Sequence, residues 1–189
     1  MLYTKPNPSG IDQYIQRLQT DLYNYLKTLW GVTDNTAPNI YDSYGRIYRV
    51  TDRDGGILPE AYTGGNDYRQ VLMDDTRAAV SFFDTGDDIQ AADGYKTAKV
   101  GLYVMANISM IPCYATATQR MDEELRNDVV SCIDQTGFGF LVTGIALGAA
   151  QAMKTYSGKK IKDGMKYRDM HPYVYFRIDL KLPNYQVCK

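Results

Sequence analysis

The feature that most constrains this sequence is the recurrence of an apolar side chain at every second position of residues 97–108, TAKVGLYVMANI. The apolar set consists of Ala98, Val100, Leu102, Val104, Ala106 and Ile108. The other set includes Thr97, Lys99, Tyr103 and Asn107. Because successive side chains of a strand point to opposite faces of a sheet, this pattern predicts a central strand with one face against a helix.

Two other segments carry the three- and four-residue spacing of an amphipathic helix. In residues 10–30 the apolar positions are Ile11, Ile15, Leu18, Leu22, Leu26 and Leu29, with Ser9 and Gly31 as suitable cap residues. In residues 117–135 the apolar positions are Met121, Leu125, Val129 and Cys132 or Ile133. Thr116 and Gln119 have the spacing of a capping box, which predicts where the second helix begins.

Further strands are predicted at residues 44–51, 57–62, 77–84 and 173–182, and residues 85–95 are expected to form a loop. The inward face of the last strand consists of Val174, Phe176, Ile178 and Leu180, and its outward face of Arg177, Asp179 and Lys181. Pro59 would place its strand at a sheet edge or a bulge. Residues 138–153 fit either a helix or a strand, and are shorter than the roughly 20 residues of a membrane span.

This order of elements predicts an α+β fold with a mainly antiparallel sheet and two long helices packed on one face. Residues 1–9 contain Pro6 and Pro8 and form an extended arm, either disordered or docked on a neighbouring subunit. Residues 10–189 form a single domain, because no linker or internal repeat divides them. The N-terminal residues MLYTKPNPSG lack the apolar run of a signal peptide.

The composition argues against several kinds of function. With 21 basic and 22 acidic side chains the formal net charge is -1, so the chain as a whole does not attract nucleic acid or an anionic membrane. The single histidine, His171, rules out sites that need two imidazoles and is expected to be structural. Cys113, Cys132 and Cys188 lack the spacing of a zinc ribbon and predict free thiols in a reducing compartment.

The sharpest local motif is Asp84-Thr85-Gly86, because Asp-Thr-Gly after an apolar strand is typical of aspartic proteases. In dimeric enzymes of the retroviral type, two such carboxylates share one proton. The alternative is a strand that ends in a turn. Asp84 could also bind a cation together with Asp87, Asp88 and Asp93, whereas Asp52 and Asp54 lack the later ligands of an EF-hand and predict a surface turn.

Two surface features favour contact with other molecules. The 17 tyrosines, against 5 phenylalanines, are more than a small core is expected to hold, and tyrosine is enriched at protein interfaces. One basic run, which begins at Lys154 and ends at Arg168, predicts contact with nucleic acid or an acidic partner. The candidate interface residues are Tyr103, Tyr156, Lys159, Lys160, Lys162, Tyr167 and Tyr173.

The layout of the chain resembles a known family when both ends are considered. An amphipathic helix within the first 30 residues leads to a series of strands, the strand TAKVGLYVMANI, the helix TATQRMDEELRNDVVSCI and the final strand DMHPYVYFRIDLKL. This layout, over roughly residues 10–182, is similar to that of tail-terminator and head–tail completion proteins of tailed bacteriophages, in particular the neck ring proteins of short-tailed crAss-like phages. The strongest sequence piece is His171-Pro172-Tyr173 with Phe176-Arg177-Ile178-Asp179.

The resemblance implies a tail-terminator-like fold and a non-enzymatic virion protein, assembled in the cytoplasm of the host bacterium. Copies would form a homo-oligomeric ring, sixfold or twelvefold, in the neck between portal and tail, sealing or extending the DNA channel. Its partners would be other copies, adjacent portal, neck or tail proteins and genomic DNA in the lumen, with no membrane. The family has no catalytic residues to carry over, and we expect no cofactor or metal in this chain. The alternatives are a dimeric aspartic protease and a soluble α+β binding module.

Overall fold

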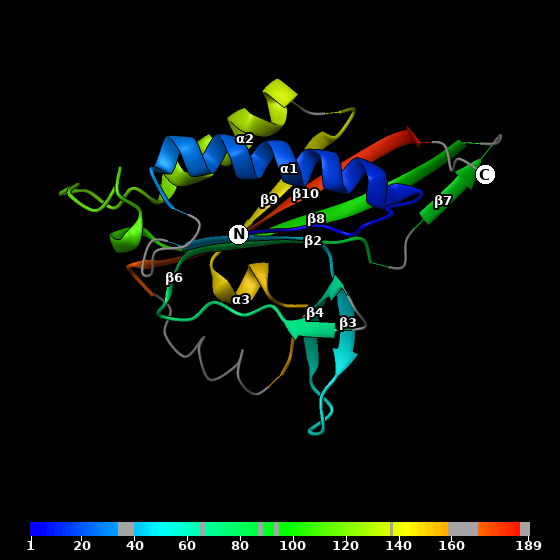
Figure 1. The fold of residues 1–189 in the computed structure, drawn as a ribbon, viewed down its shortest axis with the longest axis horizontal. Coiled ribbons are helices and arrows are strands. Elements are labelled where there is room, and N and C mark those ends of the chain that lie inside the picture. Colours follow the sequence, from blue (N-terminus) through cyan, green and yellow to red (C-terminus); the bar gives the residue numbers. More distant parts are fainter. Residues whose placement is uncertain are drawn as a thin grey trace.

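The alternating segment forms strand β8 (Tyr95–Asn107), which lies inside a seven-stranded sheet of the computed structural model (Figure 1). The structure describes residues 1–33, 40–64, 67–86, 89–92, 95–136, 138–158 and 170–185. Strands β10 (Tyr173–Tyr185) and β6 (Arg77–Asp84) flank β8, and both pair with it in antiparallel orientation. The predictions of strands at 77–84, 97–108 and 173–182 are therefore confirmed.

The rest of the sheet is mixed rather than purely antiparallel. Its order is β1-β2-β6-β8-β10-β9, and β7 (Ile89–Ala92) also pairs with β8. Strand β2 (Ile40–Arg46) runs parallel to β6, and β1 (Leu2–Tyr3) runs parallel to β2. Strand β9 (Leu141–Leu147) forms the other edge, antiparallel to β10. The α+β class is confirmed, with two parallel pairs added to a mainly antiparallel sheet.

Helices α1 (Ile11–Trp30) and α2 (Asp122–Thr136) lie on one face of this sheet (Figure 1). Leu18, Leu22 and Leu26 are fully buried against it, as the periodicity of α1 predicts. Gly31 ends the helix in the left-handed conformation, but Gly10 rather than Ser9 is the N-cap residue. Leu29 was expected in the apolar stripe but is 44% exposed, because the helix turns the larger Trp30 into the core instead.

The second helix begins five residues later than predicted, and the Thr116–Gln119 capping box does not form. Strand β8 is followed by the short 3-10 helix η1 (Ile108–Met110) and a run of turns up to the start of α2. Tertiary contacts hold these turns, since Ile111 is fully buried and the Tyr114 hydroxyl donates to Asp128 on α2. The interior stripe of α2 is as predicted and consists of Leu125, Val129, Cys132 and Ile133.

The opposite face of the sheet is also covered, which the sequence did not predict. A second sheet, with the order β3 (Tyr48–Thr51), β4 (Ile57–Gly64) and β5 (Asp67–Gln70), lies there with the short helix α3 (Ala149–Ala152) (Figure 1). A separate apolar cluster fills this side and includes Phe82, Tyr103 and Met105. Residues 102–106 of β8 are therefore buried on both faces rather than on one, whereas Lys99 nearer its start is exposed.

The small sheet corrects two predictions about its strands. The strand expected at 44–51 divides into β2 and β3, because the chain leaves the main sheet at Ile47, whose N–H donates to the Phe83 carbonyl at 2.8 Å. Pro59 lies in the central strand rather than at an edge. It lies opposite Arg49 of β3, and its carbonyl accepts a hydrogen bond from the Val71 N–H at 2.9 Å, just beyond the last β4–β5 pair of Glu60 with Gln70.

Three ambiguous segments are now assigned. Residues 138–153 contain both a strand and a helix, β9 and α3. The loop expected at 85–95 contains strand β7. The N-terminal arm docks on its own chain rather than on a neighbour, because Leu2 and Tyr3 pair with β2 and the Tyr3 ring stacks on Tyr44 at 4.5 Å. No helix within the described residues combines the length and apolar character that crossing a membrane requires.

Much of the tyrosine excess lies inside the chain. The buried tyrosines are Tyr23, Tyr41, Tyr44, Tyr103, Tyr114, Tyr156 and Tyr185. The hydroxyl of Tyr41 shows how such rings are accommodated, since it forms a 2.8 Å hydrogen bond with the Ser81 hydroxyl between the sheet and α1. The expectation that these rings face neighbouring subunits is therefore wrong for this group, because the two cores on either side of the sheet provide enough space.

Burial of tyrosine predicts a loss of stability in alkali. Burial raises the pKa of Tyr41 to about 12, against an ordinary value of about 10 in the unfolded chain. The stabilisation is complete below about pH 10 and is lost as pH rises toward 12, by roughly 1 kcal/mol for such a tyrosine near pH 11. Urea unfolding between about pH 8 and 11 measures this decline. The Tyr41→Phe variant should decline less steeply, and an unchanged slope would contradict the prediction.

Candidate anion-binding site

A hollow of about 670 Å³ lies on the side of the main sheet opposite α1 and α2. Strands β8 and β10 provide part of its lining, and Arg49 of the small sheet and Lys154, which follows α3, complete it. Its basic residues are Arg49, Lys99, Lys154, Arg177 and Lys181, and its acidic residues are Asp84 and Asp179. We call this set the basic hollow. It concentrates positive charge in a chain whose net charge is -1.

The register of the strands explains why these side chains meet. Lys99 of β8 lies directly opposite Lys181 of β10. Two residues along, Gly101 lies between two carboxylates, Asp84 on β6 and Asp179 on β10. Because side chains two residues apart share a face, these rows lie on one side of the sheet.

The Arg177 and Asp179 side chains form a two-point ion pair, with Nε–Oδ1 at 2.8 Å and Nη2–Oδ2 at 3.2 Å. Burial alone would lower the pKa of Arg177, but the hydrogen bond and charge of Asp179 outweigh it and raise that pKa. Gly101 makes room for this pair, because a Cβ there would approach Arg177 Cδ to 3.2 Å and the Tyr103 ring to 3.0 Å. The charge of Arg177 is thus largely compensated within the chain.

The Asp84 carboxylate, at the end of β6, is 6% exposed and is saturated by intrachain donors. Arg49 Nε and the Tyr156 hydroxyl donate to Oδ2 at 3.0 and 2.8 Å, and the Gly86 N–H donates to Oδ1 at 3.0 Å. Burial and the nearby Asp84 charge raise the pKa of Tyr156, so this hydroxyl remains a donor at neutral pH. The Asp-Thr-Gly motif therefore anchors the small sheet and the segment after α3 to the main sheet.

Two of the predicted interface tyrosines lie beside the hollow, but their rings are inside the chain. Tyr103 and Tyr156 are 3% and 2% exposed. Their ring centroids are 5.4 Å apart, and Tyr103 stacks on Phe82 at 4.7 Å. Burial raises the pKa of Tyr103, and a hydrogen bond with Thr155 opposes that shift. The Tyr103 ring lines the hollow, and both rings belong to the apolar cluster on this side of the sheet rather than to an exposed surface.

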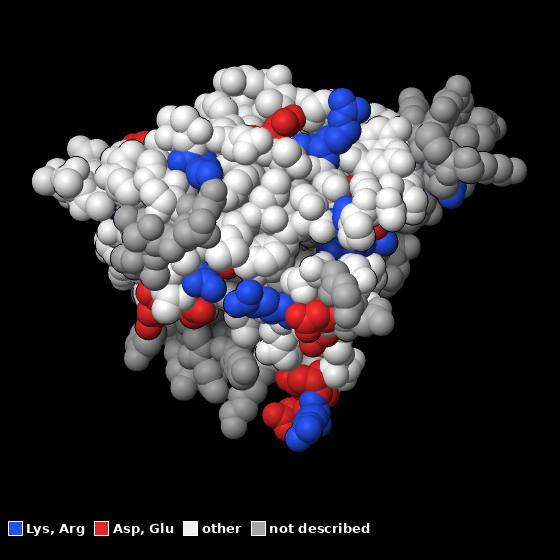
Figure 2. Space-filling view, viewed as in Figure 1, with Lys and Arg blue, Asp and Glu red and all other residues white. Residues whose placement is uncertain are grey.

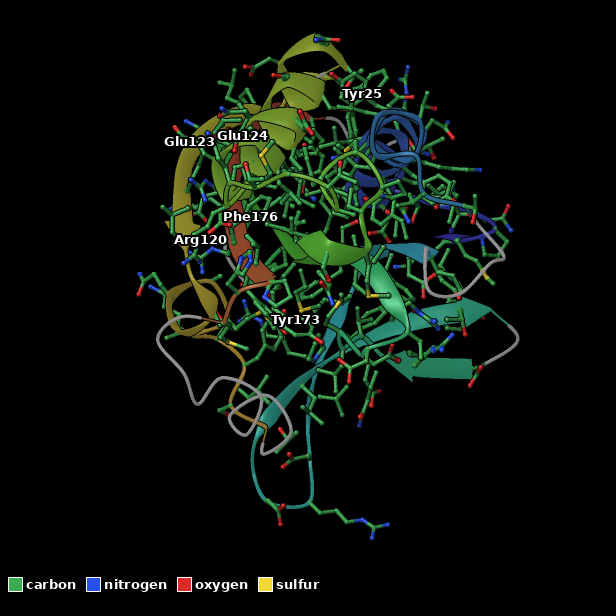
Figure 3. The ribbon with its side chains drawn as sticks, turned by 90° about the vertical axis from the view of Figure 1, so that its left-hand side faces the viewer. Tyr25, Arg120, Glu123, Glu124, Tyr173 and Phe176 are labelled. Atoms are coloured by element: carbon green, nitrogen blue, oxygen red, sulfur yellow. The ribbon has the colours of Figure 1, made fainter. Side chains whose placement is uncertain are left out.

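Of the remaining predicted interface residues, the structure describes Tyr173, which does not line the hollow. Tyr173, at the start of β10, is half-buried, and its hydroxyl donates to Asp75. It lines a second hollow of about 460 Å³ together with Arg120, and Figure 3 faces the side of the molecule on which both lie. Lys159, Lys160, Lys162 and Tyr167 lie outside the described residues, as do Asp87, Asp88 and Asp93 of the suggested cation site.

Sequence reasoning missed Lys99 and Lys181 as functional candidates, although it placed each on the polar face of its strand. The missing information is the register, which makes the two lysines direct neighbours. On the face shown in Figure 2, the described basic and acidic residues are scattered among uncharged ones, without a large patch of one sign. The basic hollow is thus a local feature of strand pairing.

The described residues offer few groups suited to catalysis or metal binding. Among them, no group of three or more His, Cys, Asp or Glu side chains is placed to hold a metal ion. Burial raises the pKa of Cys132 to about 11, so this thiol is protonated at neutral pH. What the basic hollow can do chemically is bind an anion by charge and hydrogen bonding. In comparisons with known proteins, no family model, curated protein or solved structure matches this chain.

The contacts of Asp84 predict that Asp84→Asn lowers the free energy of unfolding by about 1–3 kcal/mol, because the charge-assisted bond to Arg49 is lost in a buried setting. Urea unfolding at neutral pH measures this. Asp54→Asn, in the exposed β3–β4 turn, is the matched control and should change stability by less than about 0.5 kcal/mol. Equal effects of the two substitutions would show that Asp84 does not anchor these elements.

Proposed function

We propose that the protein is a non-enzymatic structural virion protein that forms a homo-oligomeric ring in the neck of a tailed bacteriophage, between portal and tail. Two kinds of observation support the proposal. The order of elements that carries the family resemblance, a helix, strands, a long central strand, a helix and a final strand, is retained in α1, β2, β8, α2 and β10. The chain also has an apolar sheet edge suited to a neighbouring subunit.

That edge is β9, and it is the observation that carries the proposal. Leu141, Ile145 and Leu147 are 55%, 44% and 53% exposed on a strand without any charged residue. Soluble proteins commonly protect edge strands with charges or cover them, because an exposed apolar edge invites association. A neighbouring copy of the chain would cover β9.

The geometry of β9 favours contact through side chains. Its pairing with β10 shifts register between Gly144 and Val142, and the Thr143 hydroxyl donates to the Asp179 carbonyl at 2.9 Å. Such a bulge makes a long continuous ladder with another strand less favourable. The opposite edge of the sheet is β1, a different surface. Contact between two different surfaces is heterologous, and heterologous contacts that close produce rings.

The protease alternative receives less support from Asp84. A shared proton requires a second carboxylate within hydrogen-bond reach, whereas the Asp84 carboxylate accepts hydrogen bonds from Arg49, the Tyr156 hydroxyl and the Gly86 N–H of its own chain. We expect no cleavage of denatured protein substrates at acidic pH. Pepstatin-sensitive proteolysis that is absent from the Asp84→Asn variant would reverse this ranking.

The β9 edge gives a direct test of assembly. Because each substitution buries a charge in the proposed contact, Ile145→Lys combined with Leu147→Lys should abolish self-association with little effect on the folded subunit. Sedimentation or light scattering of the purified protein measures the oligomeric state. Leu29→Lys is a control for a new surface charge, because Leu29 is as exposed as Ile145, at 44%, but lies on α1. Normal assembly of the double variant would contradict a contact through β9.

A further inference from the structure

We propose that the basic hollow is a binding site for the phosphodiester backbone of a nucleic acid. The hollow was identified from the pairing of β8 and β10, and the proposal does not depend on ring formation. Its central residues are Lys99, Lys181 and Lys154, which line the hollow and are exposed.

Positive charge remains in the hollow after the ion pairs within the chain have formed. Asp84 is paired with Arg49, and Asp179 with Arg177. The three lysines of the hollow have no ion-pair partner among the described residues. The hollow therefore offers positive charge that the described part of the chain does not neutralise, beside two arginine–aspartate pairs that hold its walls in place.

Lys99 of β8 lies directly opposite Lys181 of β10. Like charges on directly opposed residues of adjacent strands destabilise a sheet. An anion bound between the two ammonium groups would remove this repulsion. The opposed lysines thus lower the stability of the free protein and favour the state with an anion bound.

The lysines of the hollow are spread along β10 rather than gathered at one point. The Thr155 side chain hydrogen-bonds with Tyr103, which lies opposite Arg177, so the backbone of the adjacent Lys154 lies toward the Arg177 end of the hollow that its side chain lines. Lys181 lies four residues further along β10, a distance of about 13 Å at the usual rise of a strand. Charges this far apart fit a chain of successive phosphates better than one phosphate or carboxylate group.

Among the residues that the structure describes, the hollow lacks an exposed aromatic face on which a nucleic-acid base could stack. Tyr103, the aromatic residue among those that line the hollow, is almost fully buried and presents no free face for stacking. Recognition would therefore rest on backbone phosphates, which carry no sequence information. We expect binding that is independent of sequence and strongly dependent on salt.

The experiment compares two double variants that each remove two positive charges. Lys99→Gln with Lys181→Gln alters the hollow, and Arg53→Gln with Arg126→Gln removes two cations elsewhere, in the β3–β4 turn and on α2. Fluorescence anisotropy with a short labelled DNA duplex is measured between about 50 and 200 mM salt. The hollow variant should bind at least about tenfold more weakly, with a log–log salt slope smaller by about 2, while the control should match the unaltered protein.

Two further measurements make the result decisive. Thermal unfolding without DNA should show the hollow variant melting at or above the temperature of the unaltered protein at low salt, because the opposed lysines are gone. A glutamate oligopeptide of similar total charge should bind much more weakly than DNA. The proposal is overturned if the two double variants bind DNA equally, or if the acidic peptide binds as tightly as DNA and loses the same affinity in the hollow variant.

Discussion

The pairing of β8 with β10 is the interaction on which the rest of the structure depends. The two strands pair from Asn107 opposite Tyr173 to Lys96 opposite Tyr185, and β6, β7 and β9 pair with one or the other of them. Because the pleat directs alternate residues to opposite sides, the same ladder builds a core under α1 and α2 and a second core under the small sheet. Its register also fixes the rows of charged residues in the basic hollow. A shift of one residue would exchange the faces of a strand and remove both the cores and the hollow.

The elements that could be predicted are those whose signal is local. The periodicity of α1, β6, β8 and β10 is set by neighbouring residues, and their positions were found from sequence alone. The start of α2 could not be found in this way, because buried Ile111 and the contact between Tyr114 and Asp128 hold residues before the helix in turns that local capping rules do not describe. Strand β7 lacks a clear alternating pattern and is defined by its partner β8. The small sheet was partly predicted as strands, but nothing local indicates that β4 is its centre.

In the candidate site, too, local motifs could be predicted, whereas contacts between distant parts of the chain could not. Asp84 was recognised from its motif, yet its partners Arg49 and Tyr156 are 35 and 72 residues away in the chain. Lys99 and Lys181 were assigned to the polar faces of their strands, and only the register shows that they oppose each other. The tyrosines were expected between subunits because they are more than a small core was expected to hold. Two layers of core, one on each side of the main sheet, account for many of them, and the exposed apolar residues of β9 become the better guide to assembly.

In the proposed assembly, copies of this chain form a closed ring through different edges of the sheet. Electron microscopy of the purified protein, over a range of concentrations, tests this claim most directly. We expect closed rings of a single copy number, in which β9 of each subunit lies at the contact with its neighbour. A protein that stays strictly monomeric, both in isolation and within its native particle, would contradict it.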